Sequence, residues 1–288
     1  MTLASGAARL LPMWVKRLIY RLPWLAGWIR DSLNRAVPSG LTQVEVAAGG
    51  LAGMRLYLDL KSEKDYWLGT YEPELQKGIL ELVKPGMVAY DLGANIGYMS
   101  LLLGKAVGST GSVYAFEAFP ENARRLAQNV ALNGLQQRVK IVEGAVSDRS
   151  TPLRFWIGPS GNTGKVNGSA GRQGAIYSDS IFVQGYALDD FVYQENHPQP
   201  EVIKIDIEGG EVLALPGMQR LLTQVHPLIF LELHGPESAR VAWNELVSAG
   251  YRICHLRPGY PLAAGLDELD WKAYLVAFPK RGEVVEDD

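Results

Sequence analysis

The stretch that decides the fold is Val88-Ala89-Tyr90-Asp91-Leu92-Gly93-Ala94-Asn95-Ile96-Gly97-Tyr98. An apolar strand ends in Asp91, a turn containing glycine follows, and a helix is expected to begin near Asn95. This order places free backbone N–H groups and the positive end of a helix at the carboxyl edge of a sheet. A small charged ligand is expected to bind at that edge.

A second carboxylate follows at a spacing typical of a nucleoside site. The strand Ser112-Val113-Tyr114-Ala115-Phe116 leads into Glu117, about twenty residues after Gly97, where a carboxylate can bind both ribose hydroxyls. A dinucleotide such as NAD(P) favours G-x-G-x-x-G, because the second glycine lets the pyrophosphate approach the backbone. Asn95 occupies the place where that pyrophosphate would lie.

S-adenosylmethionine (SAM) is the second cofactor that this arrangement could hold. It has no phosphate, and its amino-acid end needs an acceptor for the ammonium and donors for the carboxylate. Asp91 and the backbone of residues 93–97 offer that combination, with Asn95 expected as the N-cap of the helix. The loop and Glu117 therefore favour SAM, while NAD(P) and a turn that binds nothing stay open as alternatives.

The composition excludes several classes of protein. The 288 residues carry 28 Lys and Arg against 31 Asp and Glu, so no general positive field favours nucleic acid. The one cysteine, Cys254, permits no internal disulfide, and the four histidines show no zinc-like spacing. No apolar run reaches membrane-spanning length, and Lys16, Arg17 and Arg21 interrupt any signal-peptide core. These features predict a cytoplasmic protein.

Residues 1–40 differ in composition from the rest of the chain. They combine tryptophans and basic residues with a single acidic residue, Asp31, a pattern typical of a helix at a membrane surface. Pro12, Pro23 and Gly27 break the stretch into short pieces without one long amphipathic face. We therefore expect a helical extension that packs on the domain or on a second subunit of a homo-oligomer, with peripheral membrane contact as the alternative.

The remaining chain predicts an α/β core that follows a short mixed segment. Residues 41–85 indicate a hairpin and helices, and strands alternate with helices over residues 86–280. Antiparallel strands are expected at Leu153–Ile157 and Ile181–Gln184, separated by a glycine-rich loop at 158–174. A loop of that length is plausible as a lid over an acceptor pocket. Residues 281–288 form an acidic tail.

Four predicted strands end in polar residues at the same edge of the sheet. Because Asp91 and Glu117 suffice for the nucleoside, five other residues are left for a second substrate or a metal ion: Asp206, Glu208, Glu211, Glu232 and His234. Packing does not explain an apolar strand that ends in Glu-Leu-His, since burial of an unpaired charge is costly. The alternative is that these residues cap helices or pair with Lys204.

Together these motifs resemble the FkbM-type SAM-dependent methyltransferases. They are Asp91–Tyr98, Phe116-Glu117, Asp206-Ile207-Glu208-Gly209-Gly210-Glu211 and Pro227–His234, and the D-I-E-G-x-E block is the most specific. The resemblance runs from about Tyr71 to Tyr251. It implies a doubly wound, mostly parallel, seven-stranded Rossmann-like methyltransferase sheet whose last strand is antiparallel.

Two positions depart from the pattern that the resemblance implies. The residue after Glu117 is Ala118 where the family usually has proline, and the proline is displaced to Pro120. The segment at 143–148 lacks the aspartate that many class I enzymes direct at the adenine amino group. Contact with adenine is therefore expected from the backbone near Gly144 and Ala145, or from Glu143.

The resemblance further implies O-methylation of a hydroxyl on a sugar, a glycan or a polyketide-like natural product. His234 is expected as the general base, with Asp206 and Glu232 positioning the acceptor or a magnesium ion. The residues expected to bind SAM are Asp91, Gly93, Asn95, Gly97, Glu117, Gly144, Ala145 and Asp206. The residues expected to bind the acceptor are Tyr71, Glu72, Glu208 and Glu211. The alternatives are an NAD(P)-dependent oxidoreductase and a SAM-binding scaffold without activity.

Overall fold

The computed structural model describes residues 40–158, 164–170, 177 and 179–280. The chain divides into two compact units, Met1–Pro73 and Glu74–Asp288. Apart from Gly40, the expected helical extension at 1–40 lies outside the described residues, as do the acidic tail and part of the glycine-rich loop. Within the described part of the chain, no helix is both long and apolar enough to cross a bilayer.

The first unit contains the hairpin that the sequence predicts. Strands β1 (Leu41–Glu45) and β2 (Arg55–Asp59) pair antiparallel, and the buried side chains of Val44 and Leu56 lie opposite each other. Helix α4 (Lys64–Leu68) follows. Tyr71 belongs to this unit and packs edge-on against Tyr66, with ring centroids 4.4 Å apart.

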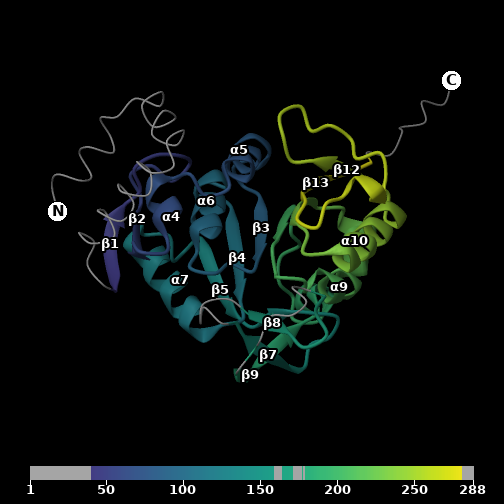
Figure 1. The fold of residues 1–288 in the computed structure, drawn as a ribbon, viewed down its shortest axis with the longest axis horizontal. Coiled ribbons are helices and arrows are strands. Elements are labelled where there is room, and N and C mark those ends of the chain that lie inside the picture. The colour runs from purple at the N-terminus through teal and green to yellow at the C-terminus, as the bar shows by residue number, and fades with distance from the viewer. Residues whose placement is uncertain (1–39, 159–163, 171–176, 178, 281–288) are drawn as a thin grey trace, which may run out of the picture. The chain divides into compact units, whose positions relative to one another are not determined.

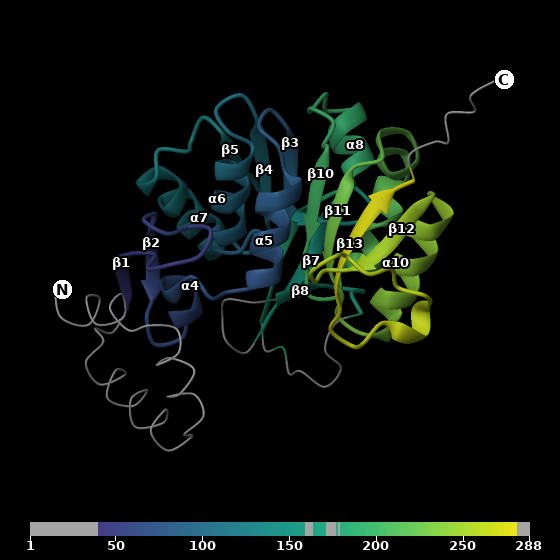
Figure 2. The same ribbon diagram turned by 90° about the horizontal axis from the view of Figure 1, so that it is seen from above.

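The second unit is built on a seven-stranded, mostly parallel sheet, as the sequence predicts. Strand β13 is antiparallel to both of its neighbours, while the other pairs are parallel. Figure 2 shows the strands side by side across the unit. In spatial order they are β12 (Tyr251–His255), β13 (Tyr274–Pro279), β11 (Leu228–Glu232), β10 (Val202–Ile205), β3 (Val88–Leu92), β4 (Ser112–Glu117) and β5 (Val139–Glu143).

Helices cover both faces of this sheet, because successive side chains of a buried strand point to opposite faces. In β10, Ile203 and Ile205 pack into one large core, and Lys204 points to the other face. The core face is covered by α8 (Leu188–Tyr193), α9 (Glu211–Ala214), α10 (Pro236–Ser248) and the short turns η1 (Pro216–Met218) and η2 (Leu221–Val225). The other face carries α5 (Pro73–Leu82), α6 (Tyr98–Ala106) and α7 (Pro120–Leu132).

A smaller four-stranded sheet interrupts the alternation where the sequence predicts antiparallel strands (Figure 1). Strand β7 (Pro152–Ile157) pairs antiparallel with β9 (Asp179–Tyr186), and β6 (Ala145–Val146) pairs with β9 on its other side. The expected loop at 158–174 is wrong in part, because Gly164–Val166 forms a further strand, β8, on the edge of β7. Backbone pairing with Phe155 and Trp156 accounts for the difference.

Candidate active site

Lys204 lies at the centre of the polar residues at the carboxyl edge of the sheet. Its Nζ is 3.1 Å from Asp91 Oδ1 and 3.6 Å from Asp206 Oδ2, and it donates a hydrogen bond to the Gly93 carbonyl oxygen. Asp91 is fully buried, and its other oxygen accepts a 2.6 Å hydrogen bond from Ser100. Lys204 therefore neutralises Asp91 and ties strands β3 and β10 to the glycine loop.

The loop at 93–97 has a backbone conformation that side chains rarely adopt. Gly93 and Gly97 have φ angles of 78° and 95°, and a Cβ on Gly93 would overlap the Asp206 carbonyl oxygen. Asn95 also has a positive φ, 50°, which asparagine tolerates better than most residues. The expectation that Asn95 caps the helix is wrong. Gly97 is the N-cap of α6, because Asn95 lies two residues before it in the left-handed turn.

Glu117 holds this loop from the neighbouring strand. Its Oε2 accepts the backbone N–H of Asn95 at 2.7 Å, and its Oε1 accepts the N–H of Phe119 at 2.9 Å. Burial raises the pKa of Glu117, and these hydrogen bonds oppose that rise. The Gly144 N–H donates to the Glu117 carbonyl oxygen, so Gly144 and Ala145 follow directly beside this carboxylate. The structure thus brings the expected nucleoside-binding residues together.

A histidine surrounded by carboxylates lies on the β10 and β11 side of Lys204. His234 Nε2 is 3.3 Å from Glu232 Oε1, 3.7 Å from Asp206 Oδ1 and 3.9 Å from Glu208 Oε2. Its other ring nitrogen, Nδ1, is 3.2 Å from Glu211 Oε1. Asp206, Glu232 and His234 each offer one ligand atom, and these atoms lie within 4.8 Å of one another.

Glu211 is fully buried, which corrects its expected role as an acceptor-binding residue. Its Oε2 accepts a 2.8 Å hydrogen bond from Ser238, and its Oε1 accepts the N–H groups of Ile207 and Gly209. Completely enclosed by these donors and His234, it offers no surface to a second substrate. Glu208 is different, because its side chain is 40% exposed beside the same histidine.

The charges at this edge shift several pKa values in opposite directions. Burial alone would lower the pKa of His234, but Glu211, Glu232 and Asp206 raise it to about 10. Burial raises the pKa of Asp206 to about 6 despite the charge of Lys204. Burial also opposes ionisation of Glu232, but hydrogen bonds from His234 and Lys272 lower its pKa to about 2. The His234 imidazole is therefore doubly protonated and positively charged at neutral pH in this structure.

Lys272 is a site residue that the sequence analysis missed. It precedes β13 and forms an ion pair with Glu232 Oε1, and its side chain is 46% exposed. No motif surrounds it, and it lies far along the chain from the glutamate that it contacts. Ser100 and Ser238 were missed for the same reason. Lys204 did carry a signal, since it is a lysine within an otherwise apolar strand.

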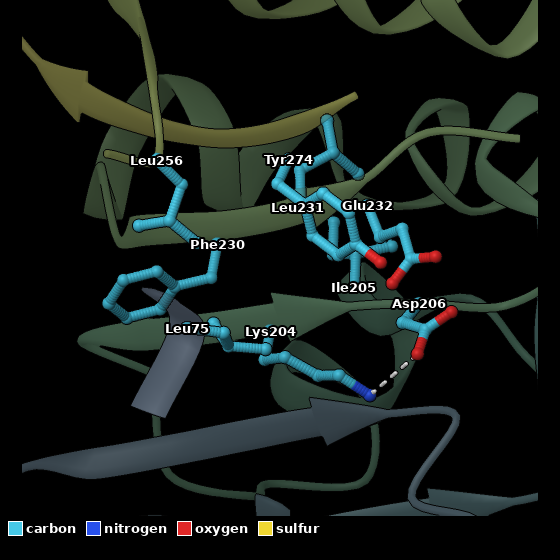
Figure 3. A pocket seen from close by; sticks show the side chains of 9 residues that line it. All are labelled: Leu75, Lys204, Ile205, Asp206, Phe230, Leu231, Glu232, Leu256 and Tyr274. Carbon is cyan, nitrogen blue, oxygen red and sulfur yellow. Dashed lines mark ion pairs between the residues drawn. The ribbon is translucent and has the colours of Figure 1, made fainter. Parts of the chain in front are cut away.

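A small hollow of about 10 Å³ adjoins the acidic residues. Figure 3 shows apolar side chains at one end and the carboxylates of Asp206 and Glu232 at the other, with Lys204 Nζ directed at Asp206. The lining residues of the hollow are Leu75, Lys204, Ile205, Asp206, Phe230, Leu231, Glu232, Leu256 and Tyr274.

Negative charge outweighs positive charge among the residues described at this edge. A cationic ligand is therefore favoured over a dinucleotide, whose two phosphates would add negative charge. The carboxylates are Asp91, Asp206, Glu208, Glu211 and Glu232, and the cations facing them are Lys204, protonated His234 and Lys272.

Of the expected acceptor-binding residues, Tyr71 and Glu72 lie in the first compact unit, so their expected role stays a prediction. Glu72 adopts a left-handed backbone conformation with φ 43°. The other expected residues on the acceptor side lie in the second unit, where four carboxylates surround the His234 imidazole: Asp206, Glu208, Glu211 and Glu232.

The chain is similar to several methyltransferases. Hexuronic acid methyltransferase AglP of Haloferax volcanii is 26% identical over 173 residues, which cover 57% of this chain and 62% of AglP. The crystal structure of methyltransferase FkbM from Methylobacillus flagellatus KT has a TM-score of 0.42 and 17% identity, covering 77% of this chain and 56% of that one. An O-methyltransferase from Bacillus cereus in complex with SAH has a TM-score of 0.41 and 16% identity, covering 73% and 82%.

The family match extends over the site itself. Residues 91–253, more than half of the chain, match the methyltransferase FkbM domain. This range begins at the first carboxylate of the glycine loop and includes Glu117, the D-I-E-G-x-E block and His234. The chain belongs to the FkbM methyltransferase family.

Proposed function

We propose that this protein transfers a methyl group from SAM to a hydroxyl of a sugar or glycan. SAM is the donor that the family implies, and AglP, which this chain matches over 62% of its length, is named for action on a hexuronic acid. The observation that carries the proposal is His234, held among carboxylates on both ring nitrogens at the carboxyl edge of the sheet. Substrates of α/β enzymes bind at this edge.

The glycine loop fits SAM. The buried Oδ1 of Asn95 has no hydrogen-bond partner among the described residues, so it is available to a bound ligand. Gly93 and Gly97 hold the loop in this shape, because a Cβ would overlap the Asp206 carbonyl oxygen at Gly93 and the Leu126 side chain at Gly97. We assign the cofactor to Asp91, Gly93, Asn95, Gly97, Glu117, Gly144, Ala145 and Asp206. When bound, SAM supplies an electrophilic methyl group on a positively charged sulfur. The negative balance of the site favours such a cation over NAD(P), the alternative cofactor.

His234 is the proposed general base. An alcohol is a weak nucleophile until its proton leaves, and general-base catalysis contributes about a hundred to ten thousand-fold. His234 must itself lose a proton first, since its pKa is about 10 in this structure. A positive charge placed beside Asp206 and Glu232 lowers that pKa, because it opposes the charge on the imidazole. His234 therefore becomes a base once a cation has bound next to it.

A divalent metal ion is one cation that these residues fit. Carboxylate oxygens are hard donors of the kind that hold magnesium, and Asp206 and Glu232 lie close enough together to share one ion. These two carboxylates would hold it, and the ion would polarise the acceptor hydroxyl and lower its pKa. His234 Nε2 would stay free to accept the proton, while Glu211 on Nδ1 fixes the orientation of the ring.

The cofactor assignment is tested by thermal unfolding with ligands. SAM and its demethylated product are expected to raise the melting temperature, while NAD and NADP leave it unchanged. A ligand at a hundred times its Kd adds about 2.7 kcal/mol to the free energy of unfolding. Glu117→Ala is expected to weaken the response. A shift with NAD and none with SAM would contradict the assignment.

The acceptor side is tested by methyl transfer to uronic acids and neutral sugars with radiolabelled SAM. Asp206→Asn and His234→Ala are expected to abolish transfer while SAM affinity changes only a few-fold. His255→Ala is the matched control, because His255 lies on β12 and pairs with Glu268 instead. Loss of turnover with a chelator and recovery with magnesium would support a role for the metal ion. Full activity in the presence of the chelator would exclude that role. SAM binding without transfer to any sugar would favour a scaffold.

A further inference from the structure

The four-stranded sheet has an outer face that no role described above requires. Side chains of β7 and β9 alternate between the two faces, and Phe155 and Val183 point into a small apolar core. The opposite face therefore carries Arg154 and Trp156 from β7 and Phe182 from β9. Phe182 is 72% exposed, which is unusual for a phenylalanine.

These outer side chains form one cluster. Arg154 lies directly opposite Phe182 in the strand register, and its guanidinium carbon is 5.6 Å from the Phe182 ring centroid and 5.5 Å from that of Trp156. Lys165 of β8 lies opposite Trp156 and adds a second positive charge. Trp156 Nε1 donates to Asn167 Oδ1, which fixes its indole ring. The face thus combines oriented aromatic rings with cations.

We infer that this outer face, Arg154, Trp156, Lys165 and Phe182, binds an acidic sugar residue of a glycan acceptor outside the reacting position. Aromatic rings stack on the C–H faces of pyranose rings, and Arg154 and Lys165 complement a sugar carboxylate. The choice of a sugar as ligand rests on the proposed function. We expect the bound sugar to be acidic because this face is positively charged. The reacting site gives no reason for that choice, since it is rich in carboxylates.

The face is connected to the reacting site through a short path of backbone. Asn167, which holds Trp156, also donates its N–H to the Arg154 carbonyl oxygen, and the chain continues to Ala170. The Ala170 N–H donates to the carbonyl oxygen of Gly209, the neighbour of Glu208. Two backbone hydrogen bonds thus link the face to the loop that carries Glu208 beside His234.

Two other occupants fit the observations less well. A nucleic acid also stacks on aromatic rings, but it needs many phosphate contacts, and here two cations stand on a chain of net charge −3. A second copy of the chain would bring identical basic clusters together in a two-fold interface. The exposed apolar area on this face is also small, because Phe182 is its only large hydrophobic exposed among the residues described there.

The test is calorimetric titration of the full-length protein with a hexamer of galacturonic acid, without SAM. Arg154→Ala/Phe182→Ala is expected to raise the Kd at least tenfold and Arg154→Glu to raise it further, whereas neutral maltohexaose binds at least tenfold more weakly than the acidic hexamer. Arg240→Ala/Val247→Ala on α10 is the matched control, one exposed basic and one exposed apolar residue away from the face. SAM-induced thermal shifts of both double variants should equal that of the wild type.

Several results would overturn the inference. They are unchanged binding by Arg154→Ala/Phe182→Ala, absence of hexamer binding by the wild type, tighter binding of a uridine dodecamer lost in the same variant, or a wild-type dimer that the variant converts to a monomer. Failure of the proposed function is a separate result. A wild type that methylates a uronic acid monomer but does not bind the hexamer refutes only this inference, and the converse refutes only the activity.

Discussion

Lys204→Met is expected to destabilise the protein strongly. The methionine fills a similar volume, but it removes the charge that faces Asp91 at 3.1 Å and Asp206 at 3.6 Å. Asp91 is fully buried and would keep Ser100 as its remaining hydrogen-bond donor among the described side chains. Removing one partner of a buried ion pair costs about 3–5 kcal/mol, because the other charge stays buried and uncompensated.

Urea unfolding followed by circular dichroism measures this cost. With a slope m of about 2 kcal/mol per molar urea, the midpoint is expected to fall by about 2 M at unchanged m. Lys140→Met, on an exposed position of β5, is the matched control and should change the free energy of unfolding by less than about 0.5 kcal/mol.

A double-mutant cycle separates the pair from the rest of the site. Asp91→Asn combined with Lys204→Met is expected to cost less than the sum of the single substitutions, because neither charge is then left alone. A loss below about 1 kcal/mol for Lys204→Met would refute the reasoning, as would additive effects in the double variant.

The remaining predictions concern His234 and the glycine loop. Glu211→Gln should lower kcat about 10–100-fold with SAM affinity unchanged in calorimetry, because the buried carboxylate orients the imidazole; an unchanged kcat would argue against this. His234 should contribute about 5 kcal/mol to the free energy of unfolding below pH 6.5, because its pKa is raised in the folded protein. This contribution is lost as the pH rises through about 10. The free energies of unfolding of the wild type and of His234→Gln, measured in urea, should therefore become equal towards pH 10. Gly93→Ala should weaken SAM binding at least tenfold through overlap with the Asp206 carbonyl, whereas Gly134→Ala, also at positive φ but with open space, should leave SAM binding unchanged in the same titration.

Much of the fold could be predicted because its signals are local. The strand over 88–92, the helix that begins at Pro120 and the antiparallel pair around residues 153–157 follow from apolar runs, proline and glycine within a few residues. The strand at 164–166 could not, since three residues of a glycine-rich stretch become a strand only by pairing with β7.

By itself, the sequence determined the order of the strands' polar ends and the motifs of the methyltransferase family, because both depend on residue type and spacing along one stretch of chain. Only the tertiary structure decided what the polar residues do to one another. Glu211 contacts His234 Nδ1 and accepts a hydrogen bond from Ser238. Lys272, just before the last strand, forms an ion pair with Glu232. The Asn95 backbone N–H donates to Glu117, and Asn95 does not cap a helix. Burial and charge pairing act through space. The raised pKa of His234, and so its positive charge, therefore depends on carboxylates whose positions in the sequence do not show that they are its neighbours.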